Sequence, residues 1–209
     1  MTAINNNQRK AIQAAISEAE TRTSAEFVTV IADAAEPYLF IPTFIAAFVT
    51  MVASGIVLML QDVLPPFTKE TFYAGQVLLF IVCAVVFRFP AVRFRLVPKA
   101  IRHVRASRMA HQLFLDLGLT ETEDRNAVLL FVAMGERYVE VIADAGLQAK
   151  LEGPAVWDGV IEAFVSDVGK GRVANGFVAA IEGCADVMAA HFPNREGAPN
   201  RFPDRLIEL

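Results

Sequence analysis

The stretch AVLLFVAMGERYVEVIA, residues 127–143, decides the fold of this chain. Its first half is apolar throughout, which is typical of a strand buried on both faces of a sheet. Gly135 and its neighbours interrupt the pattern, and a second run rich in β-branched residues begins at Tyr138. The stretch therefore predicts two antiparallel strands, 127–133 and 138–143, joined by a tight turn at Met134–Arg137.

A third strand is predicted at residues 26–32, where Phe, Val, Thr and Ile dominate. A helical crossover joins this strand to the strand at 127–133, so the two strands should be parallel. The predicted fold class is α/β, a helix–sheet–helix sandwich with a mixed sheet, interrupted by a two-helix transmembrane hairpin. Apolar spacing of about 3.6 residues predicts helices over 8–20, 99–117, 154–168 and 173–192.

Two uncharged runs lie between the first and second strands. Residues 39–60 would span about 33 Å as a helix, close to the roughly 30 Å of a bilayer core. Residues 72–87 form the second run, which extends to 92 if Arg88 reaches the interface. The sequence predicts a transmembrane hairpin over 38–92, with spans at 39–60 and 72–92. The alternatives are a hairpin buried in a soluble core and a re-entrant second segment.

The hairpin divides the predicted domain into two parts, residues 1–36 and 95–192. Both parts must lie on the same side of the bilayer to form one sheet, which agrees with an even number of crossings. Residues 193–209 form a tail that contains three prolines. Its apolar residues are expected to dock on the chain's own domain, with docking on a partner as the alternative; these are Phe202, Leu206, Ile207 and Leu209.

Charge is distributed unevenly along the chain. Net charge is −4, but residues 72–115 contain no acid, whereas residues 116–209 contain 16 acids and 8 bases. The bases that follow the second run place both termini in the cytoplasm by the positive-inside rule, in the plasma (inner) membrane. We expect five of these bases to contact anionic lipid headgroups, unless they serve topology alone: Arg93, Arg95, Lys99, Arg102 and Arg105. Nucleic acid is not expected as a partner, since no aromatic residues for base stacking are interleaved with the bases.

A candidate metal site lies where the strand at 127–133 begins and the strand at 138–143 ends. Because these strands form a hairpin, Asp124, Asn126 and Asp144 should meet at one edge of the sheet. Carboxylate and amide oxygens are ligands for Ca²⁺ or Mg²⁺. The alternative is a solvated acidic loop in which Arg125 pairs with a carboxylate and Asn126 is a turn residue.

Several stretches together resemble the TPM-domain family. They are Ala14–Val30, a helix followed by Thr-Ser-Ala-Glu and a strand; Leu113–Leu119 with Arg125–Val132; Arg137–Leu147, which ends in Gly-Leu; and Gly171–Gly176. The resemblance covers about 130 residues, everything outside the hairpin and the tail. The resemblance implies the α/β sandwich. It also implies one of two roles: acid phosphatase activity or divalent-metal binding, as in some members, or assembly or repair of membrane complexes, as in others.

The chain departs from the family pattern in three respects. The hairpin interrupts the domain after its first strand, and the expected location is cytoplasmic rather than lumenal or external. Gln148 stands where relatives often carry an acid after the Gly-Leu pair, which weakens the case for an inherited metal site. The chain also lacks a Gly-x-Ser-x-Gly elbow, a Walker-type loop and a Cys-x5-Arg phosphatase loop.

The sequence therefore predicts a membrane-anchored TPM-like module that acts as a non-enzymatic interaction or assembly and maintenance factor at the cytoplasmic face. Its expected partners are the lipid bilayer and other membrane proteins. The alternative function is a weak metal-dependent acid phosphatase that uses Asp124, Asn126 and Asp144 with Ca²⁺ or Mg²⁺.

Overall fold

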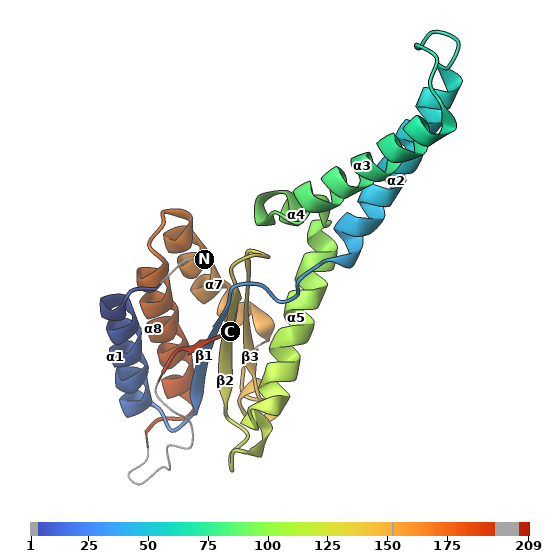
Figure 1. Cartoon of the computed structure of the whole chain (residues 1–209). Helices are drawn as coiled ribbons and strands as arrows, with labels where there is room; N and C mark the ends of the chain where they lie inside the picture. Colours follow the sequence, from blue (N-terminus) through green and yellow to red (C-terminus); the bar gives the residue numbers. More distant parts are fainter. Residues whose placement is uncertain (1–3, 152, 195–204) are drawn as a thin grey trace. The chain divides into compact units, whose positions relative to one another are not determined.

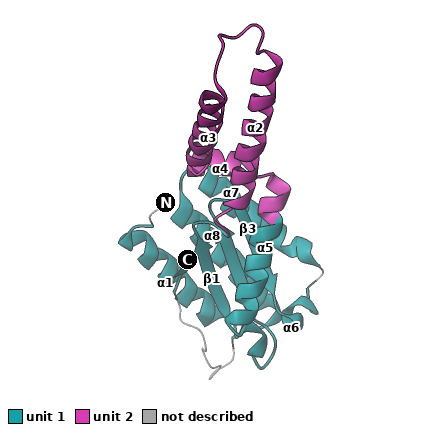
Figure 2. Cartoon of the chain, turned by 45° about the vertical axis from the view of Figure 1, so that its right-hand side comes forward, with its two compact units in different colours: residues 1–35, 104–209 teal, residues 36–103 magenta. Residues whose placement is uncertain are grey.

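The computed structural model describes residues 4–151, 153–194 and 205–209. The chain divides into two compact units, coloured separately in Figure 2. Unit 1 contains residues 1–35 and 104–209, and unit 2 contains residues 36–103. Unit 1 is thus built from both sides of the segment that the sequence assigns to the hairpin.

A four-stranded mixed sheet forms the centre of unit 1, in the order β3-β2-β1-β4. Strand β1 (Phe27–Ala32) pairs in parallel with β2 (Val128–Ala133), and β2 pairs in antiparallel with β3 (Tyr138–Ala143). These pairings confirm the predicted parallel and antiparallel neighbours. Both β1 and β2 are buried along their whole length, as expected for central strands covered on two faces.

Helices cover both faces of the sheet (Figure 1). One face carries α1 (Asn6–Arg22), α7 (Asp158–Gly169) and α8 (Val173–His191), whose apolar side chains pack on Phe27, Val128 and Leu130. The other face carries α5 (Lys99–Asp116), which packs Ala106, Ala110 and Phe114 against the opposite side chains of the strands. The alternation of side chains along each strand therefore divides the core into two layers.

Local signals agree with the helix ends. Asn5 and Gln8 form a reciprocal capping box at the start of α1. Gly118 follows α5 with a φ of 71°, the left-handed conformation expected of a glycine after a helix. The predicted helix at 154–168 is divided into the 3₁₀ turn Pro154–Trp157 and α7. Two further short elements are a 3₁₀ turn at Leu119–Glu121 and helix α6 at Ala145–Gln148.

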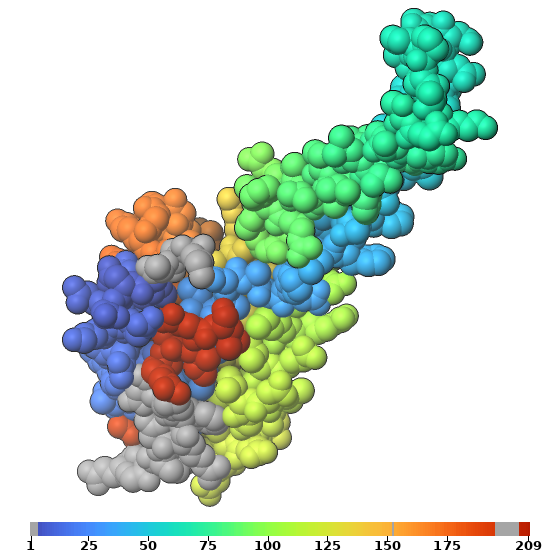
Figure 3. All heavy atoms as spheres, viewed as in Figure 1, coloured from blue at the N-terminus to red at the C-terminus, as the bar shows by residue number. Residues whose placement is uncertain are grey.

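The end of the tail docks on unit 1 through Leu206 and Ile207, as expected, whereas the Leu209 side chain is 54% exposed and Phe202 lies outside the described residues. Strand β4 (Ile207–Glu208) pairs in parallel with β1, and Leu206 is buried. The Leu209 N–H donates to the Ile31 carbonyl at 2.9 Å. Glu208 also forms an ion pair with Arg9 of α1 at 2.7 Å. Figure 3 shows these C-terminal residues in red, beside α1 in dark blue.

Unit 2 consists of α2 (Phe40–Met59), α3 (Lys69–Val86) and α4 (Pro90–Leu96). Helices α2 and α3 pack side by side and are joined by a loop (Figure 2). Helix α3 begins earlier than predicted, because Thr68 caps its N-terminus by accepting from the Thr71 N–H. It ends at Val86 rather than 92, since Pro90 begins a new helix and Phe89 before it is extended.

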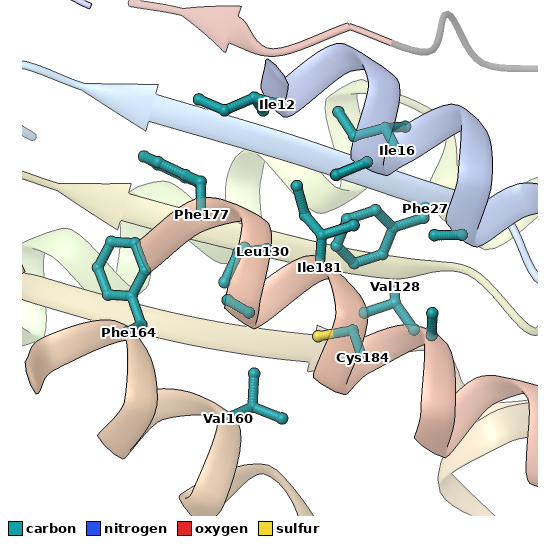
Figure 4. Packing of buried hydrophobic residues seen from close by; sticks show 14 of the residues in the cluster. Ile12, Ile16, Phe27, Val128, Leu130, Val160, Phe164, Phe177, Ile181 and Cys184 are labelled. Carbon is teal, nitrogen blue, oxygen red and sulfur yellow. The ribbon is translucent and has the colours of Figure 1, made fainter. Parts of the chain in front are cut away.

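The apolar side chains of this hairpin are exposed, in contrast to those of unit 1. Phe40 is 82% exposed, Phe44 is 65% exposed and Leu78 is 62% exposed. By length and hydropathy, α2, α3 and α8 are each apolar enough to cross a membrane. The high hydropathy of α8 is explained by its position in the core of unit 1, where its residues Phe177, Ile181 and Cys184 are fully buried (Figure 4). Most of the large apolar side chains that are exposed belong to α2 and α3.

Truncation of Ile181 to Ala should destabilise unit 1 by about 2–5 kcal/mol, because this fully buried side chain fills the layer beside Phe27. Val165→Ala, at an exposed position of α7, is the control and should cost about 0.5 kcal/mol or less. Denaturation can be followed by the fluorescence of Trp157, the one tryptophan of the chain, which is buried in unit 1. Equal midpoints for both variants would contradict this assignment of the core.

Candidate functional site

At the predicted sheet edge, the structure brings Asp144 and Arg125 together. Asp144 directly follows β3 and is buried, with an exposed fraction of 4%. The Arg125 guanidinium donates to both of its carboxylate oxygens, from Nε at 2.6 Å and from Nη2 at 2.8 Å. The Ala145 N–H donates to Oδ1 at 2.8 Å, so Asp144 also caps the short helix α6.

The backbone of Arg125 also contributes to this contact between the two ends of the β2–β3 hairpin. Its φ of 51° is left-handed, and its carbonyl accepts hydrogen bonds from the N–H groups of Gly146 and Leu147. A Cβ atom on Gly146 would lie 2.1 Å from the Asp124 carbonyl oxygen, so only glycine permits this approach. The Gly-Leu pair quoted in the sequence resemblance is therefore explained by backbone packing.

Asn126 connects the same edge to β1. Its side chain is buried, and Nδ2 donates to the Ser24 carbonyl at 3.0 Å, just before β1. Its backbone N–H donates to Thr122 Oγ1 at 3.2 Å. Asn126 thus satisfies buried backbone groups where two strands begin, a use that needs no ligand.

The electrostatics of Asp144 follow from this arrangement. Burial raises the pKa of this carboxyl, but hydrogen bonds from Arg125 and the Ala145 N–H, together with the Arg125 charge, hold the pKa below its usual value. The hydrogen bonds to Asp144 and its negative charge in turn raise the pKa of Arg125. Asp144 is therefore an ionised partner of a guanidinium.

The donor set fits a divalent cation poorly. Both oxygens of Asp144 are already bonded to a cation, and Asp124 is exposed. Within the described ranges, no three His, Cys, Asp or Glu side chains are grouped as metal ligands. The geometry favours the ion-pair alternative, while the Ca²⁺ or Mg²⁺ site stays a prediction.

The five predicted lipid-contacting bases lie on two successive helices. Arg93 and Arg95 are on α4, and Lys99, Arg102 and Arg105 are on α5. Arg93 donates from Nη1 to the Pro37 carbonyl at 2.9 Å, and its guanidinium lies over the Phe94 ring. Arg95 and Lys99 are exposed. Nearby, burial and the charges of Lys99 and Arg102 lower the pKa of His103, which favours its neutral form.

Sequence reasoning missed two features at the opposite end of the β2–β3 hairpin. Glu136 is 1% exposed, and its Oε1 accepts the Ala35 N–H at 3.0 Å, so it holds the segment that follows β1. A cavity of about 480 Å³ also lies between the β2–β3 turn and α7. A turn sequence such as Gly135–Arg137 is normally solvated, and nothing in it signals contact with a segment 100 residues away.

The comparisons with known proteins agree with this architecture. A model of the TPM domain family matches residues 92–187. The chain is similar to the NMR structure of the BA42 protein from the psychrophilic bacterium Bizionia argentinensis, with a TM-score of 0.60 and 16% identity. The similarity covers 99% of this chain and 95% of that one. No curated protein matches. These findings show a TPM-like α/β fold.

The Asp144–Arg125 pair should make unit 1 sensitive to acid. Because the folded pKa of Asp144 lies below its unfolded value, the stabilisation is complete above the ordinary carboxyl pKa of about 4 and is lost as pH falls through the folded value. Asp144→Asn should therefore be less stable than wild type at pH 7, with the difference shrinking towards pH 3 in Trp157-monitored melts. Asp116→Asn, at an exposed position, should retain the wild-type profile; a constant deficit for Asp144→Asn would refute the ion-pair role.

Calorimetric titration with Ca²⁺ and Mg²⁺ tests the metal hypothesis directly. Because Arg125 occupies both oxygens of Asp144, we expect no saturable heat from the detergent-solubilised chain. A saturable signal that is lost in Asp124→Ala/Asp144→Ala would establish the metal site and make phosphatase assays the next step.

Proposed function

We propose that this chain is a membrane-anchored TPM-like module that serves as a non-enzymatic interaction or assembly and maintenance factor at the cytoplasmic face of the inner membrane. One observation carries the proposal. The two buried clusters of unit 1 contain no residue from 36–103, whereas the hairpin exposes large apolar side chains. A folded domain therefore has its own core and carries a separate apolar hairpin.

The dimensions of the hairpin support membrane insertion. Helix α2 has 20 residues and a mean hydropathy of 2.1, and α3 has 18 residues and a mean hydropathy of 1.5. At 1.5 Å per residue they are about 30 and 27 Å long, which matches the hydrocarbon core of a bilayer. Exposed apolar surface of this extent is costly in water and is satisfied in lipid.

Charge supports the orientation. The loop between α2 and α3 contains Asp62 and no base until Lys69 begins α3, whereas seven bases follow between Arg88 and Arg108. Bases concentrated on one side favour a cytoplasmic location for that side, and so for both termini. In this orientation the exposed Arg95 and Lys99 lie close enough to anionic headgroups to contribute about 1 kcal/mol each.

The uses of the polar side chains support an interaction role over catalysis. Asp144, Arg125 and Asn126 hold the ends of strands together. Burial raises the pKa of the Cys184 thiol, which opposes formation of a nucleophilic thiolate. The acid phosphatase alternative depends on the metal site and is decided by the calorimetric titration.

Cysteine labelling of intact cells tests the anchoring. In a Cys83→Ser background, Asp62→Cys in the loop should react with an impermeant maleimide. Glu18→Cys, at an exposed position of α1, should react only after lysis. Neutralising Arg93, Arg95 and Lys99 together should produce mixed orientations, because the charge bias is reduced. Neutralising Lys10, Lys150 and Lys170 is the matched control and should preserve the orientation. Labelling of Glu18→Cys in intact cells, with all of the bases unchanged, would overturn the proposed topology.

A further inference from the structure

The two edges of the sheet in unit 1 differ. The edge of β1 is covered by β4, which the chain's own C-terminus supplies. In the part of the chain that the structure describes, no strand pairs with the outer edge of β3. An open edge presents unpaired N–H and C=O groups and can accept a further strand.

The register shows which groups point outward. The Asp144 N–H donates to the Ala127 carbonyl at 2.8 Å, and hydrogen-bonded pairs alternate along an antiparallel ladder. Tyr138, Glu140 and Ile142 therefore direct their backbone groups to β2. Val139 and Val141 direct theirs outward, where they can pair with an added segment.

A groove lies beside this edge. The cavity of about 480 Å³ is lined by apolar side chains of β3, the turn and α7, among them Met134, Val139, Phe164, Val165 and Val168. The apolar side chain of Val165 is 54% exposed, whereas Val160 and Phe164 of the same helix are buried. The volume falls in the range of about 300–1,000 Å³ that is usual for ligand sites.

A cation lines the same groove. Arg137 is exposed and has a left-handed φ of 55°. It also lines the cavity, and among the described residues it has no carboxylate partner. An occupant with a carboxylate near one end would complement this charge.

We propose that the β3–α7 groove binds an extended peptide segment of a partner protein. The segment pairs with Val139 and Val141, inserts apolar side chains beside Phe164 and Val165, and places a carboxylate on Arg137. Strand addition combines main-chain hydrogen bonds with pockets for alternate side chains. The sheet already accepts one such segment, since residues 206–209 add to β1 and bury Leu206. This inference rests on the interaction role proposed above and is independent of the anchoring.

The test uses the full chain solubilised in detergent, so that it does not depend on the anchoring, and a random heptapeptide library displayed on phage. Selected peptides should alternate apolar residues and carry an Asp, Glu or free C-terminus. When a selected peptide is synthesised and added, the amides of Val139 and Val141 should become protected from hydrogen exchange.

Two pairs of variants locate the site. Arg137→Glu should weaken the selected peptide by at least about 10-fold, while Lys10→Glu, an equally exposed charge reversal, should change affinity less than about 2-fold. Val165→Asp should weaken binding similarly, while Ala163→Asp on the same helix should not. Trp157 fluorescence melts verify that all four variants fold.

Three results would overturn the inference. The first is a library that gives no binder, and the second is a set of peptides that bind Arg137→Glu as tightly as wild type. The third is that the amides of Val139 and Val141 are already protected in the free protein and lose that protection on dilution, which would identify a second copy as the occupant. The cysteine-labelling result stands apart from all three, so failure of the groove and failure of the anchoring are distinguishable.

Discussion

The pairing of β1 with β2 is the constraint on which the rest of the structure depends. These strands are adjacent, parallel and fully buried, yet residues 33–127 separate them in the sequence. Closing so long a connection costs conformational entropy that grows slowly with length, which makes a long insertion tolerable. The inserted segment must leave unit 1 and return to it, and an apolar hairpin with two antiparallel helices satisfies that condition.

The ends of the paired strands account for three of the buried polar residues, Asn126, Glu136 and Asp144. At one end, Asn126 binds the Ser24 carbonyl while Arg125 and Asp144 bind each other. At the other end, Glu136 accepts the Ala35 N–H. Each contact joins segments far apart in the sequence, and each satisfies a group that would be costly to bury alone. Asp144, which belongs to the ligand set suggested by the sequence, therefore serves a connection at the ends of the strands.

Its edges make the sheet asymmetric. The edge beside β1 is closed by β4 and strengthened by the ion pair between Arg9 and Glu208. The edge beside β3 has an apolar groove and the cation of Arg137, which has no carboxylate partner among the described residues. The proposed interaction with a second protein therefore falls at the open edge of the sheet.

The sequence by itself determined three of the strands, their parallel and antiparallel pairing, the helices on both faces and the two apolar helices of the hairpin, because periodicity and charge distribution are local properties. The prediction that Asp124, Asn126 and Asp144 meet at one edge of the sheet rests on the β-hairpin, which brings its own ends together. Only the tertiary structure decided that Arg125 occupies both oxygens of Asp144, that Glu136 is buried against Ala35, and that residues 207–208 form a fourth strand. These outcomes depend on the positions of groups 19, 101 and about 175 residues apart, which a local pattern does not encode.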